Sequence, residues 1–317
     1  MVDTAGSPAG LSVEVLAHEQ LAWVYVERPT PAETDYLHRR YGLHPIHLAE
    51  CLTRRQQPKV AEHSDYLFVV LGVPVRNKLA RATTSGETSV FLGPDYLVTV
   101  HHGDVRPLVR LFRECQGSDE RRAEVMGYGP GYLLYAIADR LASQSLQAVE
   151  AVARDVQSAE EALLAEDDRG LARELAFLRR DVAALRRLVR PQASALARLA
   201  TYAGRSPLLG EDLSVHWASL AGRLEHLADS LEGCREAVDA LAAGAESLAA
   251  RRTRDAVRLL AVVSATTLPL LVLTTLFGLN VKDLPLASHP YAFEFVLAAL
   301  AAITVGALYL FRRSRWL

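Results

Sequence analysis

The sequence predicts an α+β domain, a long helical stalk and two C-terminal transmembrane helices, and three stretches carry that prediction. Residues 259–280 hold no charged side chain, and residues 295–311 form a second apolar run. Because a helix rises about 1.5 Å per residue, the first run spans the ~30 Å hydrocarbon core of a bilayer and the second nearly does. From residue 213 onward, apolar residues recur in 4–3 spacing, which is typical of a helix packed along its length against other helices.

The two apolar runs predict a membrane hairpin, because the loop between them is too short to cross back. Tyr291 and Phe293 extend the second run outward past Glu294. Arginines flank the inner ends of both runs, namely Arg251, Arg252, Arg254 and Arg258 before the first and Arg312, Arg313 and Arg315 after the second. The positive-inside rule therefore predicts that both termini are cytoplasmic and that the protein is a multi-pass protein of the cell (inner) membrane.

The N-terminal part alternates short elements. Residues 1–10 are small and polar, which predicts disorder, and they contain no signal peptide. Residues 21–27 and 66–73 read as strands, and residues 89–92 and 96–101 read as a hairpin around Gly93-Pro94-Asp95. Thr30-Pro31-x-Glu33 predicts the start of a helix, and Asp104 is expected to cap the next one.

The rest of the cytoplasmic part reads as helical. We expect one helix over residues 132–166 and a second over residues 171–203, in which Pro191 marks a kink or bend. The apolar seam of the third helix consists of Leu213, Trp217, Leu220, Leu224, Leu227, Leu231, Cys234, Val238, Leu241, Ala245 and Leu248. No helix breaker intervenes before Pro269, so the stalk and the first span are expected to form one rod of about 100 Å.

The resulting domain prediction runs in order along the chain. It places a disordered N-terminus at 1–10, an α/β domain at 11–130, stalk and packing helices at 131–255, the first transmembrane helix at 256–280, an outer loop at 281–290, the second transmembrane helix at 291–312, and a basic tail at 313–317. Sheet order does not follow from these patterns.

Charge and cysteine content exclude several classes of function. The formal net charge is −2, so nothing argues for a nucleic-acid partner, while local basic clusters at the membrane edge suit anionic lipid headgroups. Cys51, Cys115 and Cys234 lie far apart, which suits a reducing compartment and predicts no disulfide framework. Ser89, His101 and Asp104 lie close in sequence but form no triad pattern. We therefore predict no enzyme and no cofactor.

Two clusters of metal-ligand residues have a functional and a plain interpretation. His44, His47 and Cys51 share one face of a predicted helix, which permits a zinc site, although a solvated or half-buried helix start is the favoured interpretation. For His101-His102 at a strand end we likewise favour a structural role over a zinc site. An acidic group comprises Glu160, Glu161, Glu166, Asp167 and Asp168. We favour a solvated helix face for it over a weak Mg2+ sensor, and the position of any regulatory metal site stays open.

The membrane part resembles a known family. Phe277-Gly278-Leu279-Asn280, at the outer end of the first span, is similar to the Gly-Met-Asn signature of the CorA family of divalent-cation transporters. Further positions that match the family pattern are Pro269, Leu260, Arg258, Asp255 and Arg252, the tail of residues 312–317 that ends in Trp-Leu, and residues 43–71 and 96–102 upstream. The resemblance covers most of the chain from about Leu43 onward.

The resemblance implies a pore built from several copies of the chain. It implies five subunits, that is, a homopentamer. It implies a selectivity filter at Gly278, Leu279 and Asn280, where a ring of carboxamides would bind the water shell of the ion. It also implies a pore-lining stripe of Val257, Leu260 and Leu268 that can close the pore by dewetting. Pro269 is either a tolerated kink or a gating hinge.

Two departures from the family pattern leave the transported ion open. Leu279 replaces the Met of the signature, and Leu286 follows Pro285 where an acidic residue is common. Asp283 and Glu294 remain to attract cations at the outer mouth. In these points the loop resembles the zinc-transporting ZntB branch, so Mg2+ is the first expectation and Zn2+ (or Co2+ or Ni2+) the alternative. A membrane-anchored coiled-coil scaffold without transport is the alternative from another class, against which the polar mouth and the Thr-rich first span argue.

Overall fold

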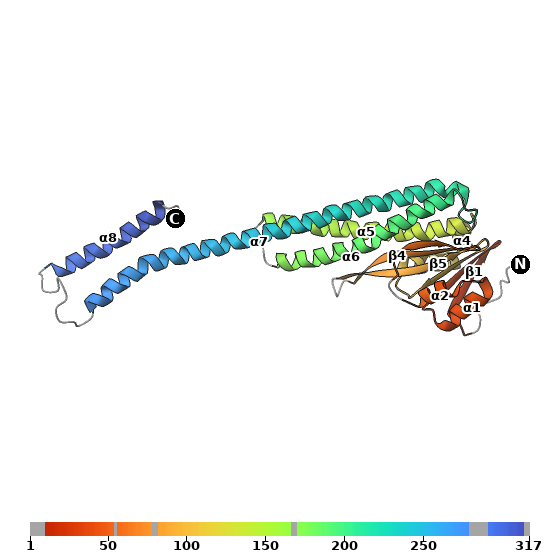
Figure 1. Ribbon diagram of the computed structural model, residues 1–317, viewed down its shortest axis with the longest axis horizontal. Helices are drawn as coiled ribbons and strands as arrows, with labels where there is room; N and C mark the ends of the chain where they lie inside the picture. The colour runs from red at the N-terminus through yellow and green to blue at the C-terminus, as the bar shows by residue number, and fades with distance from the viewer. Residues whose placement is uncertain (1–9, 54–55, 78–81, 166–169, 279–290, 314–317) are drawn as a thin grey trace. The chain divides into compact units, whose positions relative to one another are not determined.

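The computed structural model describes residues 10–53, 56–77, 82–165, 170–278 and 291–313 (Figure 1). The chain divides into two compact units, Met1–Ala242 and Ala243–Leu317, which are described separately. The predicted α+β domain, long helix and two C-terminal apolar helices are all present. The domain boundaries expected from the sequence stay a prediction.

The first unit is built on a mixed six-stranded sheet of order β1-β2-β6-β5-β4-β3. The strands are β1 (Val13–His18), β2 (Leu21–Glu27), β3 (Lys59–Glu62), β4 (Leu67–Asn77), β5 (Ala82–Leu92) and β6 (Tyr96–His101). All neighbours are antiparallel except β2 and β6, which are parallel. The hairpin predicted around Gly93-Pro94-Asp95 is confirmed as β5–β6.

The β4–β5 ribbon extends beyond the end of β6. Thr88 of β5 is paired with His101, the last residue of β6, whereas the pairing of β5 with β4 continues to Ala82. Residues 82–87 therefore have a strand neighbour on only one side. This open edge of β5 borders the cavity described below.

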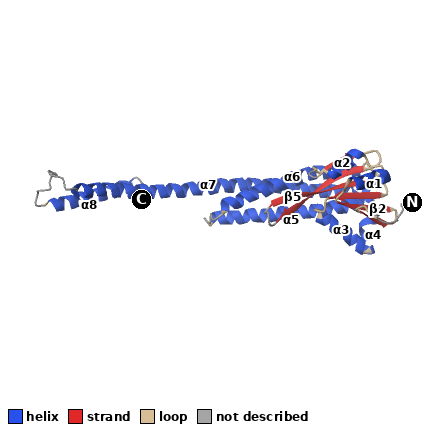
Figure 2. Ribbon diagram, turned by 90° about the horizontal axis from the view of Figure 1, so that it is seen from below, coloured by secondary structure: helices blue, strands red, loops and turns tan. Residues whose placement is uncertain are grey.

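Two short helices cover one face of the sheet, and Figure 2 shows them on the side opposite α3 (Arg106–Gly117) and α4 (Asp119–Met126). They are α1 (Pro31–Tyr41) and α2 (Pro45–Leu52). The predicted start of α1 is confirmed, because Thr30 and Glu33 form a reciprocal capping box. Leu37, Leu43 and Leu48 are fully or almost fully buried against β-strand side chains such as Phe68.

The other face packs against α3 (Arg106–Gly117) and α4 (Asp119–Met126). Phe112 stacks on Tyr25 and meets Trp23 edge-on, with ring centroids 4.3 and 5.1 Å apart. The expectation that Asp104 caps α3 was wrong: Val105 holds the N-cap position without a side-chain hydrogen bond. Asp104 instead packs its side chain against the backbone of Gly86. A methyl group added to Gly86 would lie 3.3 Å from the carboxyl carbon of Asp104.

Three long helices complete the first unit. Figure 1 shows α5 (Pro130–Leu164), α6 (Leu171–Ala203) and the start of α7 (Ser214–Gly278) side by side, and a short 3-10 helix (Glu211–Leu213) precedes α7. The helix α6 continues through Pro191. The seam of α7 is buried at Trp217, Leu220, Leu224, Leu231 and Val238, as its spacing predicted.

Ion pairs on the rim of this packing tie α7 to its neighbours. Arg179 and Arg186 of α6 pair with Asp239 and Glu232 of α7 at 2.6 and 2.5 Å, and Arg223 of α7 pairs with Asp139 of α5. All six side chains are at least partly exposed, so solvent screens each pair and each contributes little to stability. The buried apolar seam therefore supplies most of the stabilisation.

Gly72 lies at a close contact between the sheet and α6. Its N–H donates to the buried Oε1 of Gln192 at 2.9 Å, and a methyl group at Gly72 would lie 2.2 Å from Cδ1 of Leu188. Because Leu188 is buried, we expect Gly72→Ala to destabilise the first unit by about 1–3 kcal/mol through overpacking.

Gly222→Ala is the matched control for that prediction. Gly222 lies inside α7 with nothing within 4 Å of the added methyl group, so the same substitution should stabilise by about 0.5–1 kcal/mol. Chemical denaturation of the full-length protein in detergent, followed by Trp fluorescence, measures both. An equal change in the free energy of unfolding in the two variants would show that a methyl group at Gly72 does not overpack its contact with α6.

The second unit contains the C-terminal part of α7 and α8 (Ala292–Arg313). Among the described residues two helical segments are long and apolar enough to cross a membrane, Ser214–Val272 and Phe293–Arg313. Most of their large apolar side chains between Val257 and Val272 and between Phe293 and Leu310 are exposed, although Val262 is buried. So much exposed apolar surface is stable only against lipid or against other apolar helices.

Candidate functional site

The predicted pore-lining residues lie on one side of α7. Val257 and Leu268 are separated by eleven residues, about three helical turns, and Leu260 lies one turn above Val257. Their exposed fractions are 60%, 65% and 65%. These three side chains therefore form an apolar stripe that no other part of the second unit covers among the described residues.

The helix carrying this stripe continues through Pro269. A proline there leaves the carbonyl of Ala265 without its usual N–H donor. The Thr266 hydroxyl donates to the carbonyls of Val262 and Val263 at 2.9 and 3.0 Å and not to that of Ala265. Thr274 and Thr275 bond backbone carbonyls of the preceding turn in the same way. Such bonds keep hydroxyl groups satisfied in an apolar surrounding.

The predicted filter falls at the limit of the described chain. Gly278 is the last residue of α7, whereas Leu279, Asn280 and Asp283 lie outside the described residues. Glu294 lies in the first turn of α8 and is exposed. The filter and the role of the outer-mouth acids therefore stay predictions.

The positive charge expected at the cytoplasmic edge is present on both helices. Arg251, Arg252 and Arg254 are exposed on α7, and Arg312 and Arg313 form the end of α8. Arg315 lies outside the described residues. Of the acidic group, Glu160 and Glu161 are exposed near the end of α5, and Glu166, Asp167 and Asp168 lie outside the described residues.

The zinc candidates His44, His47 and Cys51 do not form a joint ligand set. Cys51 is 3% exposed, its Sγ donates to the carbonyl of His47 at 3.2 Å, and burial raises the pKa of its thiol to about 12. It therefore stays a thiol inside the core. A third histidine, His63, lies beside the other two instead, with its ring centroid 5.9 Å from that of His44 and 6.4 Å from that of His47.

His101 and His102 are also separated by their surroundings. His101 is buried, its Nδ1 accepts a hydrogen bond from the N–H of Gly103 at 3.0 Å, and burial lowers its pKa to about 4. It is a neutral core histidine at physiological pH. His102 is half-buried and lines a cavity.

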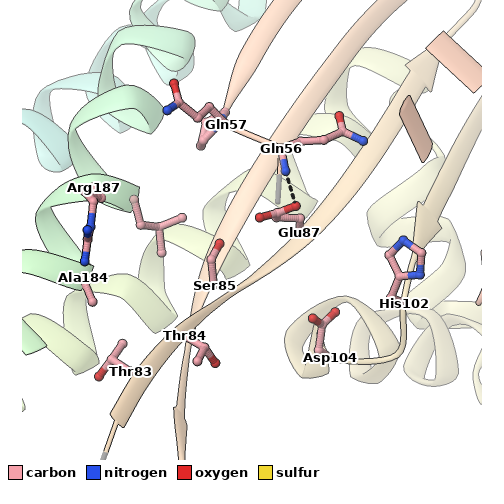
Figure 3. Close-up of a pocket in the computed structure, with 12 residues that line it drawn as sticks. Gln56, Gln57, Thr83, Thr84, Ser85, Glu87, His102, Asp104, Ala184 and Arg187 are labelled. Atoms are coloured by element: carbon pink, nitrogen blue, oxygen red, sulfur yellow. Dashed lines mark hydrogen bonds between the residues drawn. The ribbon is translucent and has the colours of Figure 1, made fainter. Parts of the chain in front are cut away.

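That cavity has a volume of about 630 Å³ and lies at the open edge of β5 (Figure 3). Its polar lining includes Gln56, Thr84, Ser85, Glu87, His102, Asp104 and Arg187. The N–H of Gln56 donates to the Glu87 carboxylate at 2.6 Å. Within the described chain, no three His, Cys, Asp or Glu side chains converge, as placed, on a point that could hold a metal ion.

Comparisons with known proteins agree on one family. A model of the family described as "CorA-like Mg2+ transporter protein" matches residues 18–313. The cobalt/magnesium transport protein CorA of Thermotoga maritima is 24% identical over 281 residues, 87% of this chain and 78% of that protein. The zinc transport protein ZntB of Yersinia pseudotuberculosis is 23% identical over 322 residues, 100% of this chain and 94% of that protein.

Solved structures show the same fold. The complete structure of the CorA magnesium transporter from Methanocaldococcus jannaschii superimposes with a TM-score of 0.79 at 22% identity, covering 94% of this chain and 92% of that chain. The full-length CmaX protein gives a TM-score of 0.74 at 22% identity, covering 93% and 89%. The fold expected from the resemblance is therefore confirmed.

Proposed function

This chain belongs to the CorA-like Mg2+ transporter family, a family of divalent-cation transporters and not of enzymes, and from that premise we propose that it forms a homo-oligomeric pore selecting hydrated Mg2+. The observation that carries the proposal is the extent of the family match, which includes most of the first unit and both apolar helices. The transported ion is the substrate, and no resident cofactor is invoked.

Several copies are needed because two helices cannot enclose a pore. The exposed stripe of Val257, Leu260 and Leu268 supports this, since an apolar helix face packed around an axis would line a narrow channel. The resemblance implies five copies. A pentamer would place five Asn280 carboxamides at the outer mouth.

A carboxamide ring suits an ion that keeps its water. Mg2+ loses its water shell reluctantly, and a neutral amide oxygen can accept hydrogen bonds from that shell without holding the ion too tightly to release it. At a membrane potential of 100 mV, entry of two charges is favoured by about 4.6 kcal/mol. An electrochemical gradient therefore suffices to drive import.

Zn2+ is the second candidate, favoured by the similarity to ZntB over the whole chain and by the missing acid after Pro285. A carrier that strips water from Zn2+ would need His, Cys or carboxylate ligands in its path. Residues 259–280 and 295–311 contain none of these, and Glu294 lies just outside the second run. We therefore place Mg2+ ahead of Zn2+.

Cobalt(III) hexammine tests whether the ion passes with its water. This complex has about the size of a hydrated divalent ion and does not exchange its ligands. We expect it to block Mg2+ uptake into proteoliposomes strongly when added at the outer side. Uptake of Zn2+ that ignores the complex and is lost in Glu294→Gln would instead support a dehydrating zinc carrier.

The proposed topology places both termini in the cytoplasm. The arginines before the first span and after the second support this arrangement through the positive-inside rule. We expect that tags at either terminus are labelled only after the cells are permeabilised. The cysteine introduced by Ser288→Cys in the loop should be labelled in intact cells, and the reverse pattern would refute the topology.

A further inference from the structure

Three histidine rings gather at the surface of the first unit, whereas the residues proposed to carry the ion belong to the second unit. His44 is the N-cap residue of α2, His47 lies one turn further along this helix, and His63 directly follows β3. Their ring centroids are 6.0 Å (His44–His47), 5.9 Å (His44–His63) and 6.4 Å (His47–His63) apart. None of the three is buried, so the cluster is open to solvent.

Tyr66 holds this cluster together. Its hydroxyl oxygen accepts a hydrogen bond from the N–H of His44 at 3.0 Å and lies 2.8 Å from Nδ1 of His47. Its ring stacks on that of His63 with centroids 4.6 Å apart. When the N–H at Nδ1 of His47 donates a hydrogen bond to the Tyr66 oxygen, Nε2 carries no proton and keeps a free lone pair. Metal-binding histidines are commonly oriented by such a bond at their second nitrogen.

The neighbouring side chains fix the rings further. His47 stacks on Phe68 with centroids 4.4 Å apart, and Nδ1 of His63 lies 3.3 Å from the Ser64 hydroxyl. Oε2 of Glu50 pairs with Nζ of Lys59 at 2.5 Å, so one oxygen of this carboxylate is engaged by a cation. The three rings themselves offer imidazole nitrogens as donors.

We propose that His44, His47 and His63 bind one borderline transition-metal ion, such as Zn2+, Co2+ or Ni2+, at a cytoplasmic site separate from the transport path. An imidazole bound through one nitrogen has its ring centre about 3 Å from the ion, so two such rings lie roughly 5–6 Å apart. The observed separations are at or slightly above that range. Water would complete the coordination. Imidazole is a poor ligand for Mg2+, so the site discriminates against that ion.

His44 is the ring with the most freedom to move so that the nitrogens converge. Its Nδ1 accepts a long hydrogen bond of 3.2 Å from the N–H of Ile46, which caps α2. The side chain is exposed, so it can exchange this bond for the ion without displacing a packed neighbour. His47 and His63 each stack on a neighbouring ring, and their separation of 6.4 Å must shorten slightly for both to bind the same ion.

Visible absorption of Co2+ tests the proposal on the full-length protein in detergent. Co2+ in a low-coordinate imidazole site absorbs far more strongly than octahedral hydrated Co2+, so ions bound as hydrates elsewhere do not interfere. We expect intense bands that saturate at one Co2+ per chain, persist in excess Mg2+ and are displaced by Zn2+. Weak octahedral bands alone would overturn the proposal.

Variants locate the site. His47→Ala and the milder His63→Gln should each abolish the intense bands, and Tyr66→Phe should weaken Co2+ binding about 10-fold or more through lost orientation of His47. The control His226→Ala, at an exposed histidine of α7, should leave the bands unchanged. Intense bands that persist in both His47→Ala and His63→Gln would refute this assignment.

This site is independent of the proposed transport function. Asn280→Ala should retain the Co2+ bands, and His47→Ala should retain Mg2+ flux. Loss of the bands in Asn280→Ala would place the bound ion in the pore and overturn the histidine site.

Discussion

Asn280→Ala is expected to abolish divalent-cation flux while the protein still assembles and keeps its stability. Asn280 is the only strongly polar side chain of residues 259–280 apart from hydroxyl groups, so alanine would leave the mouth of the first span without a group that recognises the hydrated ion. We expect loss of at least 10-fold in the initial rate of Mg2+ uptake by proteoliposomes, measured with an encapsulated Mg2+-sensitive dye. Size-exclusion chromatography checks assembly.

Asn77→Ala is the matched control, because Asn77 is the only other asparagine in the chain. It is the last residue of β4 in the first unit, so the same chemical change there should leave uptake unaltered. Wild-type flux in a properly assembled Asn280→Ala protein would remove this residue from the mechanism.

Leu260→Asn is expected to raise the leak of the resting pore several-fold. In the proposed oligomer, rings of Val257, Leu260 and Leu268 close a narrow channel by excluding water, and a carboxamide at the middle ring would allow water to enter. The measurement is the initial rate of Mg2+ uptake by proteoliposomes without an applied membrane potential, compared with that of the wild-type protein.

Leu259→Asn controls for the cost of a polar group in the span. Leu259 is 64% exposed, as Leu260 is at 65%, but it lies about 100° further around the helix. We expect no added leak from it. Equal leak in both variants, or none in Leu260→Asn, would contradict a hydrophobic gate on this stripe.

Elements whose signals are local were predictable from the sequence. The capping box of Thr30 and Glu33 identified the start of α1, and the turn Gly93-Pro94-Asp95 identified the β5–β6 hairpin. The seam of α7 was readable because its period persists over many turns. The order of the sheet was not, since the parallel pairing of β2 with β6 joins strands that are distant in sequence.

The site residues divide in the same way. The spacing of His44 and His47 along one helix predicted that their side chains lie close together. No local pattern predicted that His63 joins them, because the pairing of β3 with β4 brings it beside α2. The spacing of Cys51 places it on the same helix face as His44 and His47, yet its side chain is buried in the core. Asp104 matched a capping pattern, but its carboxyl group packs on Gly86 of a neighbouring strand. For Cys51 and Asp104, tertiary packing overrode a local signal.

Flux into proteoliposomes that contain the purified protein tests most directly whether this chain conducts divalent cations. The ions Mg2+, Zn2+, Co2+ and Ni2+ are offered in turn, with a negative internal potential set by a K+ gradient and valinomycin. We expect saturable, potential-driven Mg2+ uptake that is absent from empty liposomes and from Asn280→Ala. Vesicles that hold assembled wild-type protein and take up none of these ions would contradict it and favour a membrane-anchored scaffold.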